Sequence, residues 1–350
     1  MTATLSPSAR ILIIRLDRLG DVVLSMPVAQ ALREARPSAF LAMLVKPECR
    51  ELIDGHPALN QALVYDKAGA HRGVLSTIRF AMSLRRERFD IALVLHPTFR
   101  AHWIAWLAGI PRRIGYARKG GWLLTQRLPH EKQRGRRHEA DYTLDFVRAL
   151  GVVPSRASPA IAVSHDAVER VNQRLGEHGI DPQARLVAIH PSASSVSKRW
   201  MPERFAAVAD RLAQEQATRI VLVAGRADEP CVEQVTAAMR RPVVNLAGRL
   251  SVGELAALLR RAQLLISNDS GPVHIAAAVG TPVVAIFGRN QPGLSQGRWR
   301  PLGNHHTILQ KDVGCTVCLA DRCVIAFRCL TELPVDEVYN AAVRALRNRA

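Results

Sequence analysis

Two series of alternating strand and helix signals, separated by a segment rich in proline and serine, constrain the fold of this chain more than any other feature. Strands that alternate with helices favour parallel sheets with helices on both faces. The separating segment, residues 151–165, has the composition of a linker. We therefore predict an α/β chain with two Rossmann-like domains, residues 1–160 and 161–334, whose parallel sheets face a central cleft. No strand follows the C-terminal helix at 335–350, and this helix could therefore cross back to the N-terminal domain.

Short apolar runs define the expected strands, and the amphipathic segments between them define the helices. The expected strands lie near 11–15, 40–45, 62–65, 91–95, 185–190, 219–224, 243–246, 264–267 and 282–287. The expected helices lie near 25–36, 47–54, 74–87, 100–110, 141–151, 166–178, 202–216, 229–240, 251–261, 271–279 and 335–348. Ligands of open α/β sheets bind at the carboxyl ends of the strands, so functional side chains are expected in the segments that follow them.

The net charge of +18, from 48 Lys and Arg against 30 Asp and Glu, favours an anionic partner: nucleic acid, an acidic membrane surface or a phosphorylated substrate. No nucleic-acid-binding motif supports a basic nucleic-acid-binding protein, which stays as an alternative of a different class. Neither half carries G-x-G-x-x-G after a strand, which disfavours a dinucleotide-dependent oxidoreductase. No secretory signal or membrane-spanning run is visible, so we expect a cytoplasmic protein with reduced cysteines.

The most informative turn follows the strand that ends at Ser267. Asn268, Asp269, Ser270 and Gly271 are polar or small, and the next residues begin a helix. A helix N-terminus presents free N–H groups and a partial positive charge, which suit a diphosphate. His274 lies one turn into this helix and would add a donor. A capped helix with a core histidine is the alternative interpretation.

The segment from Asn268 to Gly288, NDSGPVHIAAAVGTPVVAIFG, resembles the signature of glycosyltransferase family 9, the lipopolysaccharide heptosyltransferases. The opening segment 11–33, ILIIRLDRLGDVVLSMPVAQALR, is similar to the first strand, turn and helix of that family, and 107–116 and 137–151 resemble its middle segments. The resemblance extends from about Ile11 to Leu330. It implies a GT-B fold, in which the N-terminal domain binds the acceptor and the C-terminal domain binds the nucleotide sugar.

The resemblance also implies the reaction. A family member would move heptose from ADP-heptose to Kdo or heptose of the phosphorylated lipopolysaccharide core. It would invert the anomeric carbon, require no cofactor or metal, and work in the cytoplasm, peripheral to the inner membrane at its inner-leaflet surface. Another nucleotide sugar, or an O-antigen, capsule or protein acceptor, is the alternative within the family.

Several residues of the second half match donor-binding positions of the family. Lys198 would stabilise the charge of the departing diphosphate, against the alternative of a solvated loop lysine. Glu229 would accept the ribose hydroxyls, a role that the neighbouring Asp228 is also suited to. Arg249 and Leu250, at the end of the next expected strand, are placed to frame the adenine through backbone and apolar contacts. The full set expected to bind the nucleotide sugar is Lys198, Ser194, Ser195, Glu229, Leu250, Asp269, Ser270, Gly271 and His274.

In the first half, basic residues near strand ends are candidates for binding a phosphorylated or carboxylated acceptor. Plain surface charge is the alternative for each of them. The basic candidates are Arg15, Arg18, Arg100, Arg118 and Lys119, and Gly20, in the turn that Arg15 and Arg18 flank, is expected to contact the acceptor with them.

Asp21 follows Gly20 in the turn where a dinucleotide-binding fold would place a phosphate-binding loop. The matching aspartate of the family is the general base that takes the proton of the acceptor hydroxyl. The alternative is an N-cap, worth about 0.5–2 kcal/mol. Pro27 weakens the cap interpretation, because a helix starting near Ser25 accommodates its missing N–H better. A carboxylate near a helix N-terminus is expected to be a weak base.

Four cysteines near the C-terminus have the spacing C-x2-C-x4-C-x5-C, whereas Cys49 and Cys231 are isolated. Four thiolates with such spacing suit a tetrahedral zinc or iron ion. Similar clusters occur in some relatives that the resemblance points to, including iron-binding protein heptosyltransferases. We expect at most a structural ion there, with no catalytic role, on Cys315, Cys318, Cys323 and Cys329.

Overall fold

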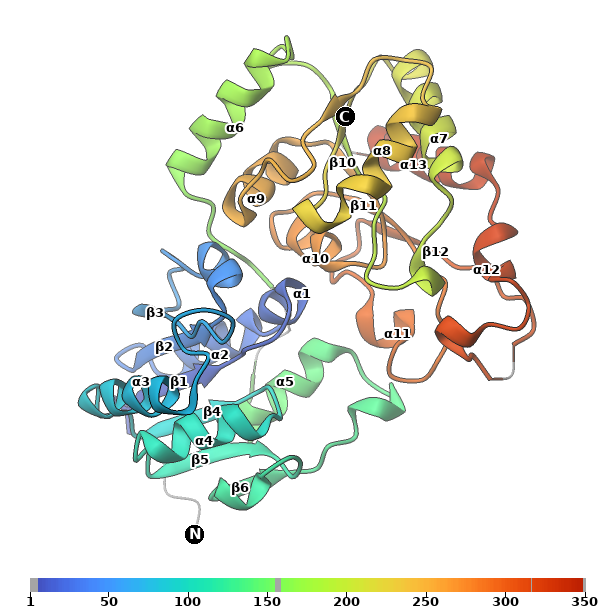
Figure 1. The fold of residues 1–350 in the computed structure, drawn as a ribbon. Helices are drawn as coiled ribbons and strands as arrows, with labels where there is room; N and C mark the ends of the chain where they lie inside the picture. The colour runs from blue at the N-terminus through green and yellow to red at the C-terminus, as the bar shows by residue number, and fades with distance from the viewer. Residues whose placement is uncertain (1–5, 155–158, 316, 349–350) are drawn as a thin grey trace. The chain divides into compact units, whose positions relative to one another are not determined.

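The computed structural model describes residues 6–154, 159–315 and 317–348, and it divides into two compact units. The units are Met1–Ala162 and Val163–Ala350, so their boundary falls inside the predicted linker. Each unit is a parallel sheet covered by helices, as Figure 1 shows for each one separately.

The first unit contains a six-stranded parallel sheet in the order β3-β2-β1-β4-β5-β6. Its strands are β1 (Arg10–Ile14), β2 (Phe40–Val45), β3 (Gln61–Val64), β4 (Ile91–Val94), β5 (Arg112–Tyr116) and β6 (Gln126–Leu128). Its helices are α1 (Leu19–Val23), α2 (Met26–Ala35), α3 (Val74–Arg86), α4 (Phe99–Leu107) and α5 (Glu139–Arg148), with 3-10 turns η1 (Pro47–Leu52), η2 (Gly121–Leu123) and η3 (Lys132–Arg134).

The central strands of this sheet are apolar on both faces because helices cover both. In β1, Ile11 to Ile14 are fully buried and pair in register with β2 and β4. Helices α3 and α4 share one apolar core with the sheet, while α2 packs against α5. The order reverses at β1, which places the carboxyl ends of β1 and β4 at a topological switch point where ligands bind in such sheets.

The second unit repeats this topology with the order β12-β11-β10-β7-β8-β9, also parallel throughout. Its strands are β7 (Leu186–His190), β8 (Arg219–Leu222), β9 (Val244–Asn245), β10 (Leu264–Asn268), β11 (Val283–Ile286) and β12 (His306–Leu309). Its longer helices are α6 (His165–Glu177), α7 (Pro202–Glu215), α8 (Glu229–Ala238), α9 (Val252–Arg261), α10 (Gly271–Ala278) and α13 (Val335–Arg347). Shorter ones are η4 (Val196–Lys198), η5 (Arg226–Asp228), α11 (Gln296–Trp299), η6 (Ala320–Arg322) and α12 (Arg328–Thr331).

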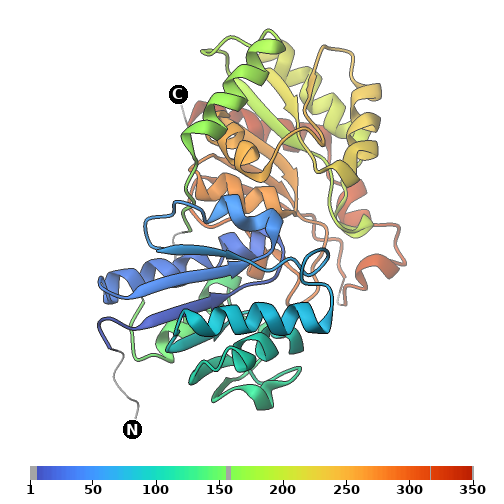
Figure 2. The same ribbon diagram turned by 60° about the vertical axis from the view of Figure 1, so that its left-hand side comes forward.

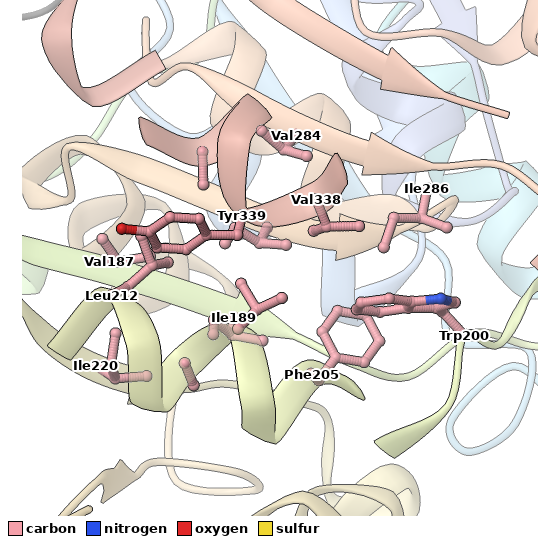
Figure 3. Packing of buried hydrophobic residues seen from close by; sticks show 14 of the residues in the cluster. Val187, Ile189, Trp200, Phe205, Leu212, Ile220, Val284, Ile286, Val338 and Tyr339 are labelled. Atoms are coloured by element: carbon pink, nitrogen blue, oxygen red, sulfur yellow. The ribbon is translucent and has the colours of Figure 1, made fainter. Parts of the chain in front are cut away.

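Helix α13 belongs to the second unit, so the suggested course back to the N-terminal domain is wrong. It packs against α7 and strands β10 to β12, and its Val338 and Tyr339 are buried in the same core as Trp200 and Phe205 (Figure 3). The rings of Trp200 and Phe205 meet edge to face with centroids 5.0 Å apart. Each such buried side chain contributes roughly 1.5–3 kcal/mol, which holds the helix on its own sheet.

Three strands were not predicted, and each has a local reason. β5 begins with Arg112 and Arg113, and these two charged residues hide the apolar pattern by which a strand is predicted. β6 and β12 are short edge strands that are only partly buried. The helix predicted at 47–54 is the 3-10 turn η1.

Candidate active site

Asp21 lies in α1, just past the carboxyl end of β1, within a buried group of charges. Its Oδ1 accepts a hydrogen bond from Arg15 Nη2 at 2.5 Å, and its side chain is 16% exposed. Burial, together with the nearby carboxylates of Asp17 and Glu139, raises the pKa of Asp21 above its usual range, against the opposing effect of Arg15. The expectation of a weak base is therefore wrong, because desolvation disfavours the charged form more than its surroundings favour it.

Arg15 is the centre of this group rather than a contact for the acceptor. Its side chain is 2% exposed, and Nη2 also donates to Glu139 Oε1 at 3.0 Å while Nη1 donates to the Leu95 carbonyl. Glu139 is fully buried and also accepts a hydrogen bond from Lys132 Nζ at 2.5 Å. The proposed acceptor contact by Arg15 is thus corrected: its guanidinium is committed to carboxylates of its own chain.

Asp17 and His96 complete the same edge of the sheet. His96 Nε2 lies 2.9 Å from Asp17 Oδ1, and Arg15 Nε lies 3.4 Å from Asp17 Oδ2. Burial acts to raise the pKa of Asp17, but Arg15 and the hydrogen bond from His96 outweigh it and lower this pKa. Sequence reasoning missed Asp17, His96, Lys132 and Glu139. The position of His96 directly after a strand was the available signal.

The capping interpretation of Asp21 does not fit the backbone. α1 begins at Leu19 with Arg18 at the N-cap, and Asp21 is the third helical residue. The chain then breaks, and α2 begins at Met26 with Pro27 in its first turn. The predicted restart near Ser25 is confirmed, and the missing N–H of Pro27 falls where no partner is needed.

The remaining acceptor candidates lie beyond the carboxyl ends of strands in the same sheet. Gly20 is buried inside α1, and Arg18 precedes it. Arg100 is the second residue of α4 and donates from Nη1 to the Tyr65 hydroxyl at 3.3 Å. Arg118 and Lys119 are exposed in the loop after β5. The roles of these residues stay predictions.

In the second unit, Lys198 and Asp269 form an ion pair that joins two strand ends. Lys198 Nζ lies 2.5 Å from Asp269 Oδ2, and the two side chains are 15% and 6% exposed. Lys198 closes the turn η4 after β7, and Asp269 follows β10. Burial raises the pKa of Asp269, and Lys198 opposes this rise. Lys198 is therefore a mostly buried, paired cation, which excludes the solvated loop lysine.

The turn between β10 and α10 is braced by a histidine that sequence reasoning missed. His190 Nδ1 lies 3.1 Å from Ser270 Oγ and 3.3 Å from Ser267 Oγ. Burial lowers the pKa of His190 to about 4, so the ring is neutral at pH 7. Ser270 is the N-cap of α10, yet its hydroxyl makes no capping hydrogen bond. The first turn of α10, with Gly271 at its start, is thus not closed by its own cap, as an anion site requires.

His274 is buried within α10, and its ring centroid lies 6.5 Å from that of Trp299.

The two serines assigned with Lys198 differ in their surroundings. Ser194 is exposed, whereas the hydroxyls of Ser195 and Ser197 hydrogen-bond to the Asp321 carboxylate. Arg289 completes this group, with Nε donating to Ser197 Oγ at 2.7 Å and Nη2 lying 3.0 Å from Asp321 Oδ2. The hydrogen bonds from the serines lower the pKa of Asp321. Sequence reasoning could not pair Ser195 with Asp321, because 126 residues separate them.

Glu229, the predicted ribose contact, begins α8, and its carboxylate lies against Gly248. Gly248 has φ +67°, a conformation that favours glycine, and a Cβ at this position would overlap Glu229 Oε1. Asp228, the alternative, is half-buried in η5, and Leu250 is half-buried after β9. The glycine therefore keeps room for the Glu229 carboxylate.

All four clustered cysteines are free and line one cavity, together with Ser197, Gly288 and Arg289. Cys329 Sγ donates to the Gly288 carbonyl at 3.0 Å, and burial together with the other cysteines raises the pKa of its thiol. Within the described ranges, the only three metal-ligating side chains whose ligand atoms lie within 4.8 Å of one another are the exposed His165, Asp166 and Glu169. The cysteines therefore surround one space without forming a ready tetrahedral site.

A family model, glycosyltransferase family 9 (heptosyltransferase), matches residues 77–326. The chain belongs to this family. It is 28% identical over 286 residues to the lipopolysaccharide core heptosyltransferase OpsX of Haemophilus influenzae, with 80% of this chain and 79% of the relative covered. A family 9 glycosyl transferase from Veillonella parvula has TM-score 0.88 and 25% identity over 99% of both chains.

The E. coli heptosyltransferase WaaC, solved with ADP-2-deoxy-2-fluoro heptose, has TM-score 0.71 and 16% identity, and it covers 97% of this chain and 100% of its own. At this identity it supports the fold alone. Together with the two doubly wound parallel sheets, these comparisons confirm the predicted α/β GT-B fold class and identify the protein as a glycosyltransferase. In the part of the chain that the structure describes, no helix is both long enough and apolar enough to cross a bilayer.

Proposed function

We propose that this family 9 enzyme transfers heptose from ADP-heptose to Kdo or heptose of the lipopolysaccharide inner core. The observation that carries the proposal is Asp21, a carboxylate at the switch point of the first sheet. Arg15 holds its Oδ1, and its pKa is raised. A dinucleotide-binding fold would place a phosphate-binding loop at this turn. A carboxylate there suits a hydroxyl substrate instead.

The proposed reaction is a single displacement that inverts the anomeric carbon. The acceptor oxygen forms the new bond to this carbon as the bond to the diphosphate breaks, and ADP leaves with the bonding electrons. Asp21 takes the proton of the acceptor hydroxyl. The raised pKa of Asp21 makes it a better base, provided that the pH is high enough to keep it ionised.

On the donor side, the proposal rests on the edge of the second sheet. Lys198 and the first turn of α10 supply positive charge where the diphosphate of ADP-heptose would develop negative charge. Asp269 balances Lys198 in the described structure, and a bound diphosphate would compete with it for the ammonium group. Glu229, beside Gly248, is suited to two ribose hydroxyls. The resemblance of segment 268–288 to the heptosyltransferases makes ADP the first nucleotide to test.

The decisive experiment is a transfer assay with ADP-heptose and purified acceptors of defined truncation, namely Kdo2-lipid A and its heptosylated form. We expect one heptose to be added to one of them, with inversion seen by NMR and with unchanged rate in EDTA. Transfer to neither would contradict the assignment. Thermal stabilisation by ADP, but not by UDP, would test the choice of nucleotide separately from the choice of acceptor.

We also propose that the enzyme works in the cytoplasm, peripheral to the inner membrane, because its acceptor would be a lipid-linked sugar. The four cysteines are proposed to hold a structural zinc or iron ion, supported by the single cavity that they line. In the described ranges the four sulfur atoms do not form a compact cluster. They would therefore have to move closer together to bind one ion.

A further inference from the structure

We infer that the outer face of α3 and α4, with the loop that follows β5, is a docking surface for an anionic phospholipid bilayer. This inference rests on the proposed lipid-linked acceptor and names the surface that would meet the membrane. We call this surface the α3/α4 face. Its exposed apolar residues are Val74, Leu75, Met82, Phe99, Trp106 and Trp122, and its cations are Arg72, Arg79, Arg85, Arg86, Arg118 and Lys119.

The large apolar side chains of this face are exposed and do not belong to the hydrophobic core. Trp122 is 70% exposed, Leu75 is 69%, and Phe99 and Trp106 are close to half exposed. Phe99 also stacks on Trp103, with centroids 6.2 Å apart, so an aromatic stripe runs along the outside of α4. Such a concentration of exposed aromatic and aliphatic groups marks an interaction surface rather than ordinary solvent exposure.

These residues share one side of the first unit. Helices α3 and α4 pack against each other and lie side by side in Figures 1 and 2. The turn η2, which carries Trp122, packs on α4, and the Phe99 ring lies against Gly120 in the adjoining loop. The inner sides of both helices are buried in one core, which fixes the outward direction of the remaining side chains.

The charge of the face has one sign. Neither residues 67–86 nor residues 91–130 contain a single Asp or Glu, in a chain that has 30 of them. The two stretches contain 11 Lys and Arg residues, of which the six that belong to the face are Arg72, Arg79, Arg85, Arg86, Arg118 and Lys119. Among the described residues none of these forms a salt bridge, so their charge is not neutralised by the protein.

Exposed tryptophan and phenylalanine beside unpaired cations suit the boundary between lipid headgroups and acyl chains. The rings enter the boundary, and the cations meet anionic headgroups. A second copy of the chain fits less well, because two such faces would bring their cations together. The face also adjoins the predicted acceptor contacts Arg100, Arg118 and Lys119, so a docked bilayer would present a lipid-linked sugar beside them.

Vesicle sedimentation of the full chain tests the inference. We expect binding to vesicles of phosphatidylethanolamine with phosphatidylglycerol, weak binding to phosphatidylcholine, and loss of binding in high salt. R79E/R86E should reduce partition by roughly tenfold or more, and W106S/W122S should reduce it similarly. R344E/R347E, on exposed positions of α13, and V153S, at an exposed linker position, are the matched controls and should bind normally.

Transfer to a water-soluble, deacylated acceptor separates this inference from the proposed function. The face variants should retain this activity and lose only the advantage that vesicles give with a lipid-linked acceptor. Unchanged vesicle binding by both face variants would overturn the inference, as would equal binding to neutral vesicles. It would also be overturned if light scattering showed a dimer that W106S/W122S dissociates, which would assign the face to self-association.

Discussion

Arg15 Nη2 lies 3.0 Å from Glu139 Oε1, although 124 residues separate the two in the chain, and both side chains are buried. The same nitrogen binds Asp21. Glu139 therefore competes with Asp21 for one guanidinium, and its charge adds to the effects that raise the pKa of Asp21. A positioning role for Glu139 follows, because it acts on the proposed base through Arg15.

E139Q is predicted to shift the acid limb of the pH profile of kcat/KM to lower pH. Removing the Glu139 charge lowers the pKa of Asp21, and Arg15 is then drawn more strongly to Asp21. Because the base acts in its ionised form, a lower pKa keeps it active at lower pH. D141N, on the same helix, is the control and should leave the profile in place. A profile that does not move, or moves upward, would exclude this role.

D21N is predicted to reduce transfer by about 10²–10⁴-fold, the range usual for loss of a general base. ADP binding, followed by calorimetry, should be unchanged, because Asp21 belongs to the first unit and the proposed nucleotide site to the second. The melting temperature should fall little, since an amide can still accept the hydrogen bond from Arg15. Retained activity with a large loss of stability would show a structural role alone.

K198A is predicted to lower kcat by about 10²–10³-fold, because a cation that neutralises the leaving diphosphate acts mainly in the transition state. The variant also leaves Asp269 buried without its ammonium partner, so its stability must be measured alongside. K198A/D269N is the matched variant, in which no buried charge is left unpaired. If the double variant recovers both stability and activity, Lys198 serves only to balance Asp269.

The alternation of strands and helices predicted both sheets and the boundary between the units, because period and turn signals are local. The same pattern did not predict elements whose place depends on contacts with residues far away in the sequence. β5 was not predicted because it begins with the charged residues Arg112 and Arg113, although the strand pairs with β4. The helix α13 lacks a partner strand, and only the buried packing of Val338 and Tyr339 shows where it belongs.

The residues of the candidate site also fall into those that local sequence predicts and those that it does not. Asp21, Lys198 and Asp269 could be predicted, since each follows a strand in a segment that resembles the family. The remote contacts of the site could not be predicted: Glu139 binds Arg15, His190 contacts Ser270, and Asp321 accepts a hydrogen bond from Ser197, each across a long stretch of sequence. The expected basicity of Asp21 was wrong for this reason: burial and the remote Glu139 are invisible in the local sequence.

G248A is predicted to weaken ADP binding while leaving the acceptor side intact. The added Cβ would overlap the Glu229 carboxylate, and the backbone at φ +67° costs a residue other than glycine about 1–2 kcal/mol. Calorimetry with ADP should show the loss, and a denaturant titration should show the smaller destabilisation. G225A is the control, because a Cβ at Gly225 meets nothing within 4 Å and its φ is not positive. If Glu229 contacts the ribose, G248A/E229A should bind ADP no better than E229A alone. Recovery of ADP affinity in that double variant would instead show that the Glu229 carboxylate is only a steric neighbour of Gly248.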